Sequence, residues 1–146
     1  MAQTVILSLD MGGTTLSYGL VQPDGRVRFQ RAVGTHARGR GEAVIQQVLE
    51  VTRTLLEVAS RRRLRVSGIG IGVPGTVDVA RGRIRENIQN VPELEGVALG
   101  PLLRRRFALP VHLDNDVNAH TLGELYFGRG RGVQNFAMLA AGTGVG

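Results

Sequence analysis

Two short apolar runs joined by a glycine-containing turn constrain the fold of this chain more than any other feature. The first run, Val5 to Leu9, is rich in β-branched and aliphatic residues and predicts a buried strand. The second run, Leu16 to Val21, follows directly after the turn Asp10-Met11-Gly12-Gly13-Thr14-Thr15. The pattern predicts a hairpin whose first strand delivers the carboxylate of Asp10 into the turn.

The residue types in this turn are those that hold phosphate groups. Gly12 and Gly13 let the backbone adopt conformations closed to other residues and approach a ligand closely. Thr14 adds a hydroxyl and an amide donor of the kind that binds phosphate oxygens. A carboxylate repels a phosphate unless a metal ion or its water shell lies between them, and Mg²⁺ is commonly held in this way. The turn predicts a nucleotide-phosphate loop with Asp10 facing Mg²⁺; ordinary hairpin-turn chemistry is the alternative.

The rest of the chain alternates strand and helix patterns. Apolar residues at three- and four-residue steps from Gly41 to about Arg63 predict a long amphipathic helix. Pro23-Asp24-Gly25 predicts a turn before a third strand, so that the first three strands form an antiparallel meander. The further predicted elements are strands at Arg26–Val33, Val66–Val73, Pro110–Leu113 and Asn135–Ala141, and helices at Leu99–Phe107 and Val117–Phe127. This order indicates an α/β fold with a mixed sheet and flanking helices.

Composition narrows the function classes. The 146 residues fit one ordinary domain, and 42% of them are hydrophobic, which is enough to build a core. The chain has no cysteine, which excludes disulfides, thiolate metal sites and thiol catalysis within it. No run approaches the roughly 18 uncharged apolar residues of a membrane span. The strand pattern begins soon after Met1, and we expect a cytoplasmic protein with no membrane partner.

The net charge of +6 comes from 18 basic residues that are all arginine. They cluster at Arg61–Arg65, Arg81–Arg85 and Arg104–Arg106, and no aromatic residue lies within these clusters. Nucleic-acid binding favours a contiguous basic face with stacking aromatics. The first and third clusters lie near the ends of predicted helices, where cations are favoured by the helix dipole. We therefore expect no nucleic-acid partner.

A second polar cluster, Asp114-Asn115-Asp116, stands between a predicted strand and a predicted helix. Asp116 lies at the positive end of the helix dipole, and a carboxylate there can accept a proton from an attacking hydroxyl. The alternative is simple capping of the helix, with Asp114 as the cap or strand-end residue. The histidines form no cluster with ligand spacing, so we expect His36, His112 and His120 to be surface or hydrogen-bonded residues rather than metal ligands.

The order of the motifs resembles that of the ROK family of sugar kinases and their repressor relatives. The resemblance covers essentially all 146 residues. It rests on the Asp-x-Gly-Gly-Thr hairpin, Gly72-Val73-Pro74-Gly75, Asn90-Val91-Pro92, Asn115-Asp116 before a helix, Glu124 with Gly128, and Gly142-Thr143-Gly144. That family belongs to the actin–hexokinase–Hsp70 superfamily, so the resemblance implies a ribonuclease H-like (actin-like ATPase) lobe.

The resemblance also implies roles for the motif residues. Asp116 is implied as the catalytic general base on the sugar hydroxyl, and Asp10 as the residue that faces Mg²⁺ through water. The implied substrate-binding residues are Gly75, Asn90, Asn115 and Asp116, and the implied cofactor-binding residues are Asp10, Gly12, Gly13, Thr14, Gly142, Thr143 and Gly144. Two positions depart from the family pattern, because Thr15 stands where lysine or asparagine is common and Leu94 where tryptophan often follows the asparagine.

The implied activity is ATP-dependent phosphorylation of a hexose, as in glucokinases, with ATP and Mg²⁺ as cofactors. Two alternatives stay open. One is the sugar-sensing domain of a ROK repressor, although repressors carry a helix-turn-helix before the first strand. The other is an inactive fragment that retains only half of a sugar site.

The resemblance implies that residues 1–118 form the small lobe and that residues 119–146 begin the second lobe. The chain stops at the second phosphate motif, so we expect it to be the front part of a longer sequence. Zinc is implied only for a longer form. We also expect the Asn135–Ala141 strand to be poorly covered or packed on another chain, and a homo-oligomer follows from that exposure.

Overall fold

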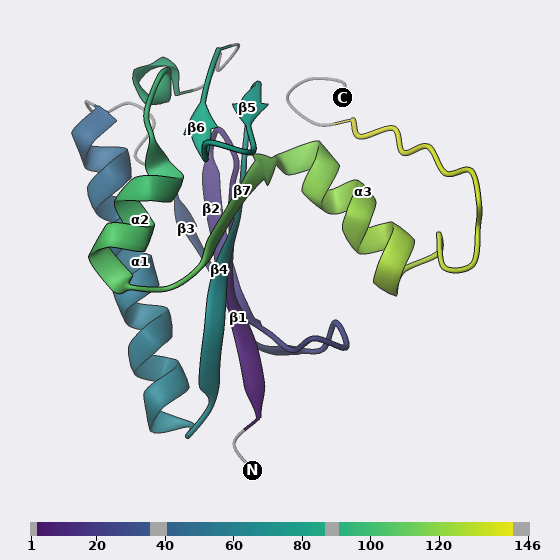
Figure 1. Ribbon diagram of the computed structural model, residues 1–146, viewed down its shortest axis with the longest axis horizontal. Helices are drawn as coiled ribbons and strands as arrows, with labels where there is room; N and C mark the ends of the chain where they lie inside the picture. The colour runs from purple at the N-terminus through teal and green to yellow at the C-terminus, as the bar shows by residue number, and fades with distance from the viewer. Residues whose placement is uncertain (1–2, 36–40, 87–90, 142–146) are drawn as a thin grey trace.

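A five-stranded mixed sheet forms the centre of the molecule (Figure 1). The computed structural model describes residues 3–35, 41–86 and 91–141. The strand order in the sheet is β3-β2-β1-β4-β7. The elements are β1 Thr4–Met11, β2 Thr15–Val21, β3 Val27–Gly34, α1 Gly41–Arg61, β4 Arg65–Val73, β5 Val77–Asp78, β6 Arg83–Ile84, the 3-10 helix η1 Pro92–Leu94, α2 Leu99–Phe107, β7 Val111–Asn115 and α3 Asp116–Phe127.

The predicted meander is confirmed. β1 pairs antiparallel with β2 and β2 with β3, whereas β1–β4 and β4–β7 are parallel. The hairpin between β2 and β3 turns at Gly25, whose φ of 85° is open to glycine and strained for most other residues. The parallel pairs place the carboxyl ends of β1, β4 and β7 at the same edge of the sheet.

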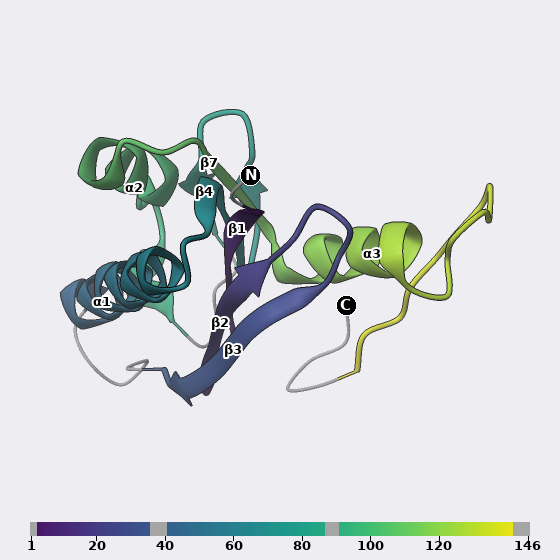
Figure 2. The ribbon, with the colours of Figure 1, turned by 90° about the horizontal axis from the view of Figure 1, so that it is seen from below.

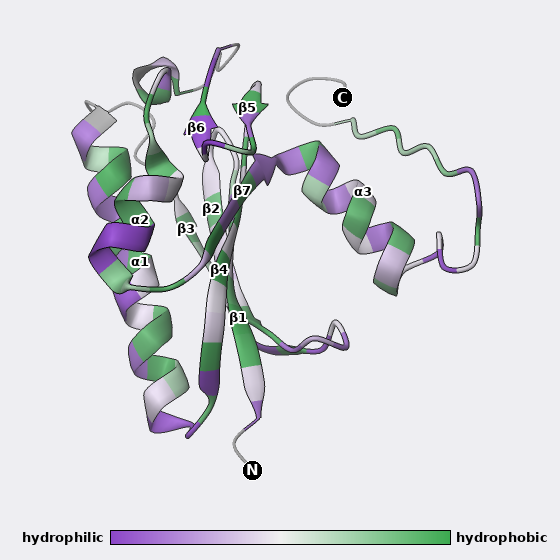
Figure 3. Cartoon of the chain, in the orientation of Figure 1, coloured by the Kyte–Doolittle hydropathy of each residue, from purple (hydrophilic) through white to green (hydrophobic). Residues whose placement is uncertain are grey.

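Helices α1 and α2 cover one face of the sheet, and this face contains the core (Figure 2). Every second residue of β1 is buried there, and β4 contributes its alternate apolar residues Ile69, Ile71 and Val73. From α1 the fully buried side chains include Val44, Val48 and Leu55, which follow the helical period predicted from the sequence. Figure 3 shows the matching alternation of polar and apolar residues along α1.

Helix α3 lies on the opposite face of the sheet, and none of its residues is buried (Figure 2). It is anchored at its first turn against β4 and β7, and at its far end the Phe127 ring lies against Gly25 of the β2–β3 hairpin. Leu122, Tyr126 and Phe127 remain 44–64% exposed. One face of the sheet is thus a packed core, while the other is largely open.

A small two-stranded sheet, β5–β6, lies beside the carboxyl edge of the main sheet. Asp78 of β5 closes its turn, because Oδ1 accepts a hydrogen bond from the Arg81 amide at 3.1 Å and Oδ2 one from the Arg81 guanidinium at 3.0 Å. These bonds, with the positive charge of Arg85, hold the pKa of the Asp78 carboxyl below its usual value. Asp78 is therefore a turn former with a structural role.

The strand predicted at Asn135–Ala141 is wrong for residues 135–140, which the structure describes as irregular chain with only a single bridge at Ala141. An apolar run alone does not make a strand, because its backbone groups need a partner strand, and none is paired with residues 135–140 in the described part of the chain. The expected poor cover is confirmed, since Leu139 is 79% exposed and this segment is apolar in Figure 3.

The predicted boundary at residues 118–119 falls inside α3, and the division into two lobes stays a prediction. Across residues 3–35, 41–86 and 91–141, the helices are too short or too polar to cross a membrane. The arginine clusters near helix ends are confirmed, with Arg61 in the last turn of α1 and Arg104 to Arg106 in that of α2.

Candidate active site

The carboxyl ends of β1, β4 and β7 bring together polar residues that are far apart in the sequence. In the parallel registers, Asp10 lies opposite Gly72, and Gly72 opposite Asp114. One step further, Val73 lies opposite Asn115, after which α3 begins at Asp116. The two motifs singled out in the sequence, around Asp10 and around Asp116, therefore flank a single strand.

Gly72 sets the closeness of this approach. A Cβ atom at position 72 would lie 3.3 Å from the Asp116 Cα, 3.7 Å from the Ala119 Cβ and 3.7 Å from Asp10 Oδ1. The first turn of α3 thus packs on the bare backbone of β4, a close approach that glycine permits. The Asp10 carboxylate and the backbone of Asp116 therefore both lie close to Gly72.

Three hydrogen bonds fix the turn after β1, and they leave two of its amides without a partner in the described chain. The Gly12 amide donates to the Thr15 carbonyl at 2.8 Å, and the Thr35 amide donates to the Thr14 carbonyl at 2.9 Å. The Thr35 hydroxyl also donates to the Gly12 carbonyl at 3.0 Å. Within the described chain, the amides of Gly13 and Thr14 have no hydrogen-bond partner. Successive free amides at an exposed turn are donors suited to an anion such as a phosphate.

Asn115 is the N-cap of α3 and also a tie to the neighbouring turn. Its Oδ1 accepts from the amides of Val117 at 2.9 Å and Asn118 at 3.1 Å, while its Nδ2 donates to the Gly75 carbonyl at 2.9 Å. Gly75 itself has a φ of 85°. An asparagine amide has two N–H groups, so Asn115 keeps one hydrogen for a ligand. Its predicted sugar contact is thereby limited to donating a single hydrogen bond.

Asp116 is the first residue of α3, and its side chain is half-buried. One oxygen, Oδ1, accepts from the Val117 amide at 2.9 Å. The other, Oδ2, has no hydrogen-bond partner among the described residues. A carboxylate at a helix N-terminus is stabilised by the dipole, and this one keeps a free oxygen for a hydroxyl group.

These residues fit the requirements of a magnesium nucleotide. Asp10 supplies a half-exposed carboxylate, and the open amides of Gly13 and Thr14 follow it in the turn. Mg²⁺ is usually bound through one or two carboxylates together with phosphates and water. The described residues contain no group of three or more His, Cys, Asp or Glu that could hold a metal by itself. The Asp10 carboxylate and the Gly13 and Thr14 amides thus fit a Mg²⁺ ion whose other ligands are phosphate oxygens and water.

The ROK family model matches residues 6–146. The chain belongs to the ROK family. It is 37% identical over 146 residues to a glucokinase of Thermotoga maritima, covering 100% of this chain and 44% of that protein. It is 29% identical over 145 residues to a xylose repressor of Caldicellulosiruptor bescii, covering 97% of this chain and 35% of that protein.

The fold is also that of ROK proteins. A ROK family glucokinase from Streptomyces griseus, solved in complex with glucose and AMPPNP, superposes with a TM-score of 0.85 at 28% identity. The match covers 97% of this chain and 43% of that one. This likeness confirms the predicted actin-like α/β lobe. The chain spans less than half the length of each of these relatives.

Part of the ROK motif set lies outside the described residues. Asn90, predicted to bind sugar hydroxyls, and Gly142, Thr143 and Gly144, predicted as the second phosphate motif, belong to this part. Their roles stay predictions. The residues that the structure does bring together are Asp10, the Gly12–Thr14 turn, Gly75, Asn115 and Asp116.

Two contributors to this ROK site were not assigned to it from the sequence. His120 was expected to be a surface or hydrogen-bonded residue, and its Nε2 lies 3.3 Å from Asp10 Oδ2. Its spacing of four residues from Asp116 on a predicted helix was a usable signal, because such residues share a helix face. Thr35, which fastens the phosphate turn, had no such signal in the sequence.

Two polar residues have structural roles around α3. Asp114 was expected to be the cap or a strand-end residue; the cap is Asn115, and Asp114 lies at the end of β7. Its Oδ1 accepts from the Asn115 amide at 2.7 Å and from Asn118 Nδ2 at 3.1 Å. Glu124 closes the other end of the helix, where its Oε2 accepts from the Arg129 amide at 3.1 Å. Gly128 belongs to the same closure, since its amide donates to the Glu124 carbonyl at 3.0 Å.

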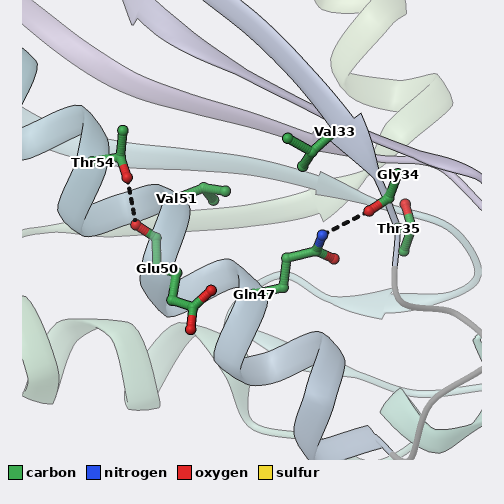
Figure 4. A pocket seen from close by; sticks show the side chains of 7 residues that line it. All are labelled: Val33, Gly34, Thr35, Gln47, Glu50, Val51 and Thr54. Atoms are coloured by element: carbon green, nitrogen blue, oxygen red, sulfur yellow. Dashed lines mark hydrogen bonds between the residues drawn. The ribbon is translucent and has the colours of Figure 1, made fainter.

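Two surface hollows lie near these elements. One, of about 210 Å³, is on the open face of the sheet and is lined by Ser8, Asp10, Ser17, Tyr18, Gly19, Val21, Val27 and Gln30. The other, of about 510 Å³, lies between the end of β3 and α1 (Figure 4). Gln47 in that hollow donates to the Gly34 carbonyl at 2.7 Å, next to Thr35. Thr35, which donates to the phosphate turn, lines the larger hollow, whereas Asp10 lines the smaller one.

Proposed function

We propose that this chain provides the hexose-binding and phosphate-binding front of an ATP-dependent sugar kinase of the glucokinase type. The observation that carries the proposal is the convergence of Asp10 and Asp116 across Gly72 at the end of the phosphate turn. The likeness to a glucokinase of Thermotoga maritima over the whole of this chain supports it.

In this proposal, Asp116 is the general base. Its free oxygen, Oδ2, accepts the proton of a sugar hydroxyl as that hydroxyl attacks the terminal phosphate of ATP. Such a base contributes by being in hydrogen-bond reach of the proton that it accepts. Asn115 donates its remaining amide hydrogen to the same sugar, and Gly75 lies beside it because Asn115 holds its carbonyl.

The phosphates are held by the turn after β1. The amides of Gly13 and Thr14 bind phosphate oxygens, and the contacts from Thr35 keep the turn in place. Asp10 faces Mg²⁺ through water. Bound with the nucleotide, Mg²⁺ neutralises the charge that repels an incoming hydroxyl and Asp10 from the phosphates.

The alternative is a sugar-sensing domain of the repressor type. The 29% identity to a xylose repressor over 97% of this chain favours it specifically. A sensor needs the sugar contacts of Asn115 and Asp116 but no phosphoryl transfer. A chain with only half of a sugar site also binds without turnover, and differs from the sensor in binding more weakly.

The test is a calorimetric titration of the chain with glucose and then with a small hexose panel, beside an assay for hexose phosphate formation with ATP and Mg²⁺. Asp116→Ala is the test variant. Asp24→Ala is the matched control, because Asp24 is an exposed carboxylate in the β2–β3 hairpin, which follows the end of β2 opposite to the phosphate turn.

We expect saturable hexose binding that weakens at least about tenfold in Asp116→Ala and not in Asp24→Ala, as for the loss of a charged hydrogen bond. Formation of hexose phosphate supports the kinase, and tight sugar binding without it supports the sensor. A wild-type chain that binds no hexose and forms no hexose phosphate overturns the proposal.

A further inference from the structure

His120 projects from α3 toward the strand that carries Asp10. Its Nε2 lies 3.3 Å from Asp10 Oδ2, and this is the one polar contact of the Asp10 side chain among the described residues. An ionised carboxylate only accepts hydrogen bonds, so Nε2 is the donor in this pair. His120 follows Asp116 by one helical turn on the same helix face, so α3 carries both the proposed base and the partner of the proposed magnesium-facing carboxylate.

The contact has a consequence for the geometry of the site. The imidazole is 53% exposed and the Asp10 carboxylate 44% exposed, so without this bond the carboxylate would be free to rotate in solvent. Partners of metal-binding side chains fix the orientation of the ligand, and their loss weakens metal binding without removing a ligand. Because α3 is seated on Gly72, the orientation of Asp10 is set by the same helix that positions Asp116.

We propose that His120 is a positioning residue, which holds the Asp10 carboxylate in the orientation that binds the magnesium form of the nucleotide. The inference rests on the proposed function and extends it to a residue on α3. It joins the phosphate side of the site to the sugar side through one hydrogen bond between β1 and α3.

A neighbouring histidine provides the control. His112 on β7 also faces a carboxylate, with its Nε2 3.7 Å from Asp114 Oδ2, which is too long for a hydrogen bond. Asp114 is held instead by the Asn115 amide and by Asn118. His112 is therefore a histidine beside a carboxylate that does not depend on it.

The experiment measures two properties of the chain and of its His120→Ala, His120→Gln and His112→Ala variants. The first is the Kd of a non-hydrolysable ATP analogue, by calorimetry, with Mg²⁺ and with EDTA. The second is the NMR signal of the His120 side chain in the wild-type chain and in Asp10→Asn. Thermal unfolding of each variant shows that it is folded.

We expect His120→Ala to raise the Kd of the magnesium form by about tenfold, the low end for such partners, and to leave the EDTA value unchanged. His120→Gln places an amide N–H where Nε2 lay and restores the Kd to within about twofold, while His112→Ala changes nothing. Asp10→Asn shifts the His120 signal and not that of His112.

Two failures are distinguishable. Wild-type binding of the magnesium form with an unchanged Kd in His120→Ala overturns the positioning role and leaves the proposed function standing. A wild-type chain that binds no nucleotide with or without Mg²⁺ overturns the proposed function, and the positioning role with it. An equal loss with Mg²⁺ and with EDTA also overturns the role, because it indicates a general effect on the fold of α3.

Discussion

The two faces of the central sheet are built from the same strands but differ in everything that packs on them. On the α1 and α2 face, alternate residues of β1 and β4 are buried under two helices, and this face contains the apolar core. On the other face, β4 presents Gly68, Gly70 and Gly72, and β1 presents Ser8 and Asp10. The only helix there among the described residues is α3, which has no buried residue.

The difference separates stability from chemistry. Among the described residues, the buried side chains are apolar apart from Gln47 and Thr52, so the covered face is suited to hold the sheet together. The open face has a smooth backbone over which α3 lies close enough for His120 and Asp116 to approach Asp10. Glycine contributes no side-chain packing and weakens a strand interior. In β4 the glycines lie on the face where Asp10 and Asp116 come close to the strand.

The largest expected difference in stability is between one Leu→Ala substitution on the covered face and one on the open face. Leu55 of α1 is fully buried, and Leu55→Ala should lower the free energy of unfolding by about 2–5 kcal/mol through lost burial and a residual cavity. Leu122 of α3 is 44% exposed, and Leu122→Ala should change it by about 0.5 kcal/mol or less. Urea unfolding at two protein concentrations measures both. Equal losses would mean that α3 is covered in solution, and a loss that depends on concentration would identify a second copy as the cover.

The next contrast uses two glycines on the same strand and the same face. A Cβ at Gly70 meets nothing closer than the Ile6 Cγ2 at 3.8 Å, whereas a Cβ at Gly72 meets the Asp116 Cα at 3.3 Å. Gly70→Ala should be neutral or stabilising by up to about 1 kcal/mol, since alanine restricts the unfolded chain. Gly72→Ala should destabilise by about 1–3 kcal/mol because the backbone of α3 must move.

The measurement for the glycine pair is urea unfolding together with the NMR signal of His120. Only Gly72→Ala should shift that signal, because α3 carries His120 away from Asp10. If the two variants behave alike, α3 does not rest on Gly72.

The covered face was largely predictable from the sequence. The apolar run Val5 to Leu9 and the helical period from Gly41 onward identified β1 and α1, because burial of a strand or of one helix face leaves such a pattern in the sequence. The predicted limits of α2 and of α3 also agree with the structure to within one residue. Asp10 and Asp116 were assigned to one site from the order of motifs, and the parallel register of β1, β4 and β7 now places them together.

The open face was less predictable, for a physical reason. The contact of His120 with Asp10 joins two elements, and its only sequence signal was the four-residue spacing of His120 from Asp116. The contact of Thr35 with Gly12, in the neighbouring phosphate turn, had no signal in the sequence. The strand expected at residues 135–140 was also wrong, because its apolar run is typical of a strand while its pairing partner depended on other parts of the fold. The identity of the helix cap, Asn115 rather than Asp114, was decided by where β7 ends.

A smaller effect tests how α3 is attached to the open face. Asn115→Ala removes the helix cap and the bond to the Gly75 carbonyl, and should lower the free energy of unfolding by about 1–2 kcal/mol. Asn115→Ser keeps a capping oxygen and loses only the bond to Gly75, so its loss should be about half as large. Urea unfolding of both variants separates the two contributions. A serine variant as unstable as the alanine variant would show that the tie to Gly75, rather than the cap, holds the start of α3.

The smallest expected effect on stability lies outside both faces of the main sheet, at Asp78 in the small β5–β6 sheet. Hydrogen bonds from Arg81 and the charge of Arg85 lower the pKa of Asp78 in the folded chain below its unfolded value of 3.8. Such a group stabilises the fold at pH above 3.8, and the contribution is lost as the pH falls through the lower, folded pKa. Asp78→Asn should therefore be slightly less stable than the wild-type chain at pH 7, and the difference should shrink in acid. It should also shrink in high salt, because the side chains of Arg81 and Arg85 are 75% and 57% exposed and salt screens exposed charges. Thermal unfolding between pH 2 and pH 7 at low and high salt measures this. A difference that persists at the lowest pH would mean that Asp78 stabilises the Arg81 turn by hydrogen bonds in either protonation state. The β5–β6 turn would then resemble the covered face, where uncharged contacts rather than charge determine stability.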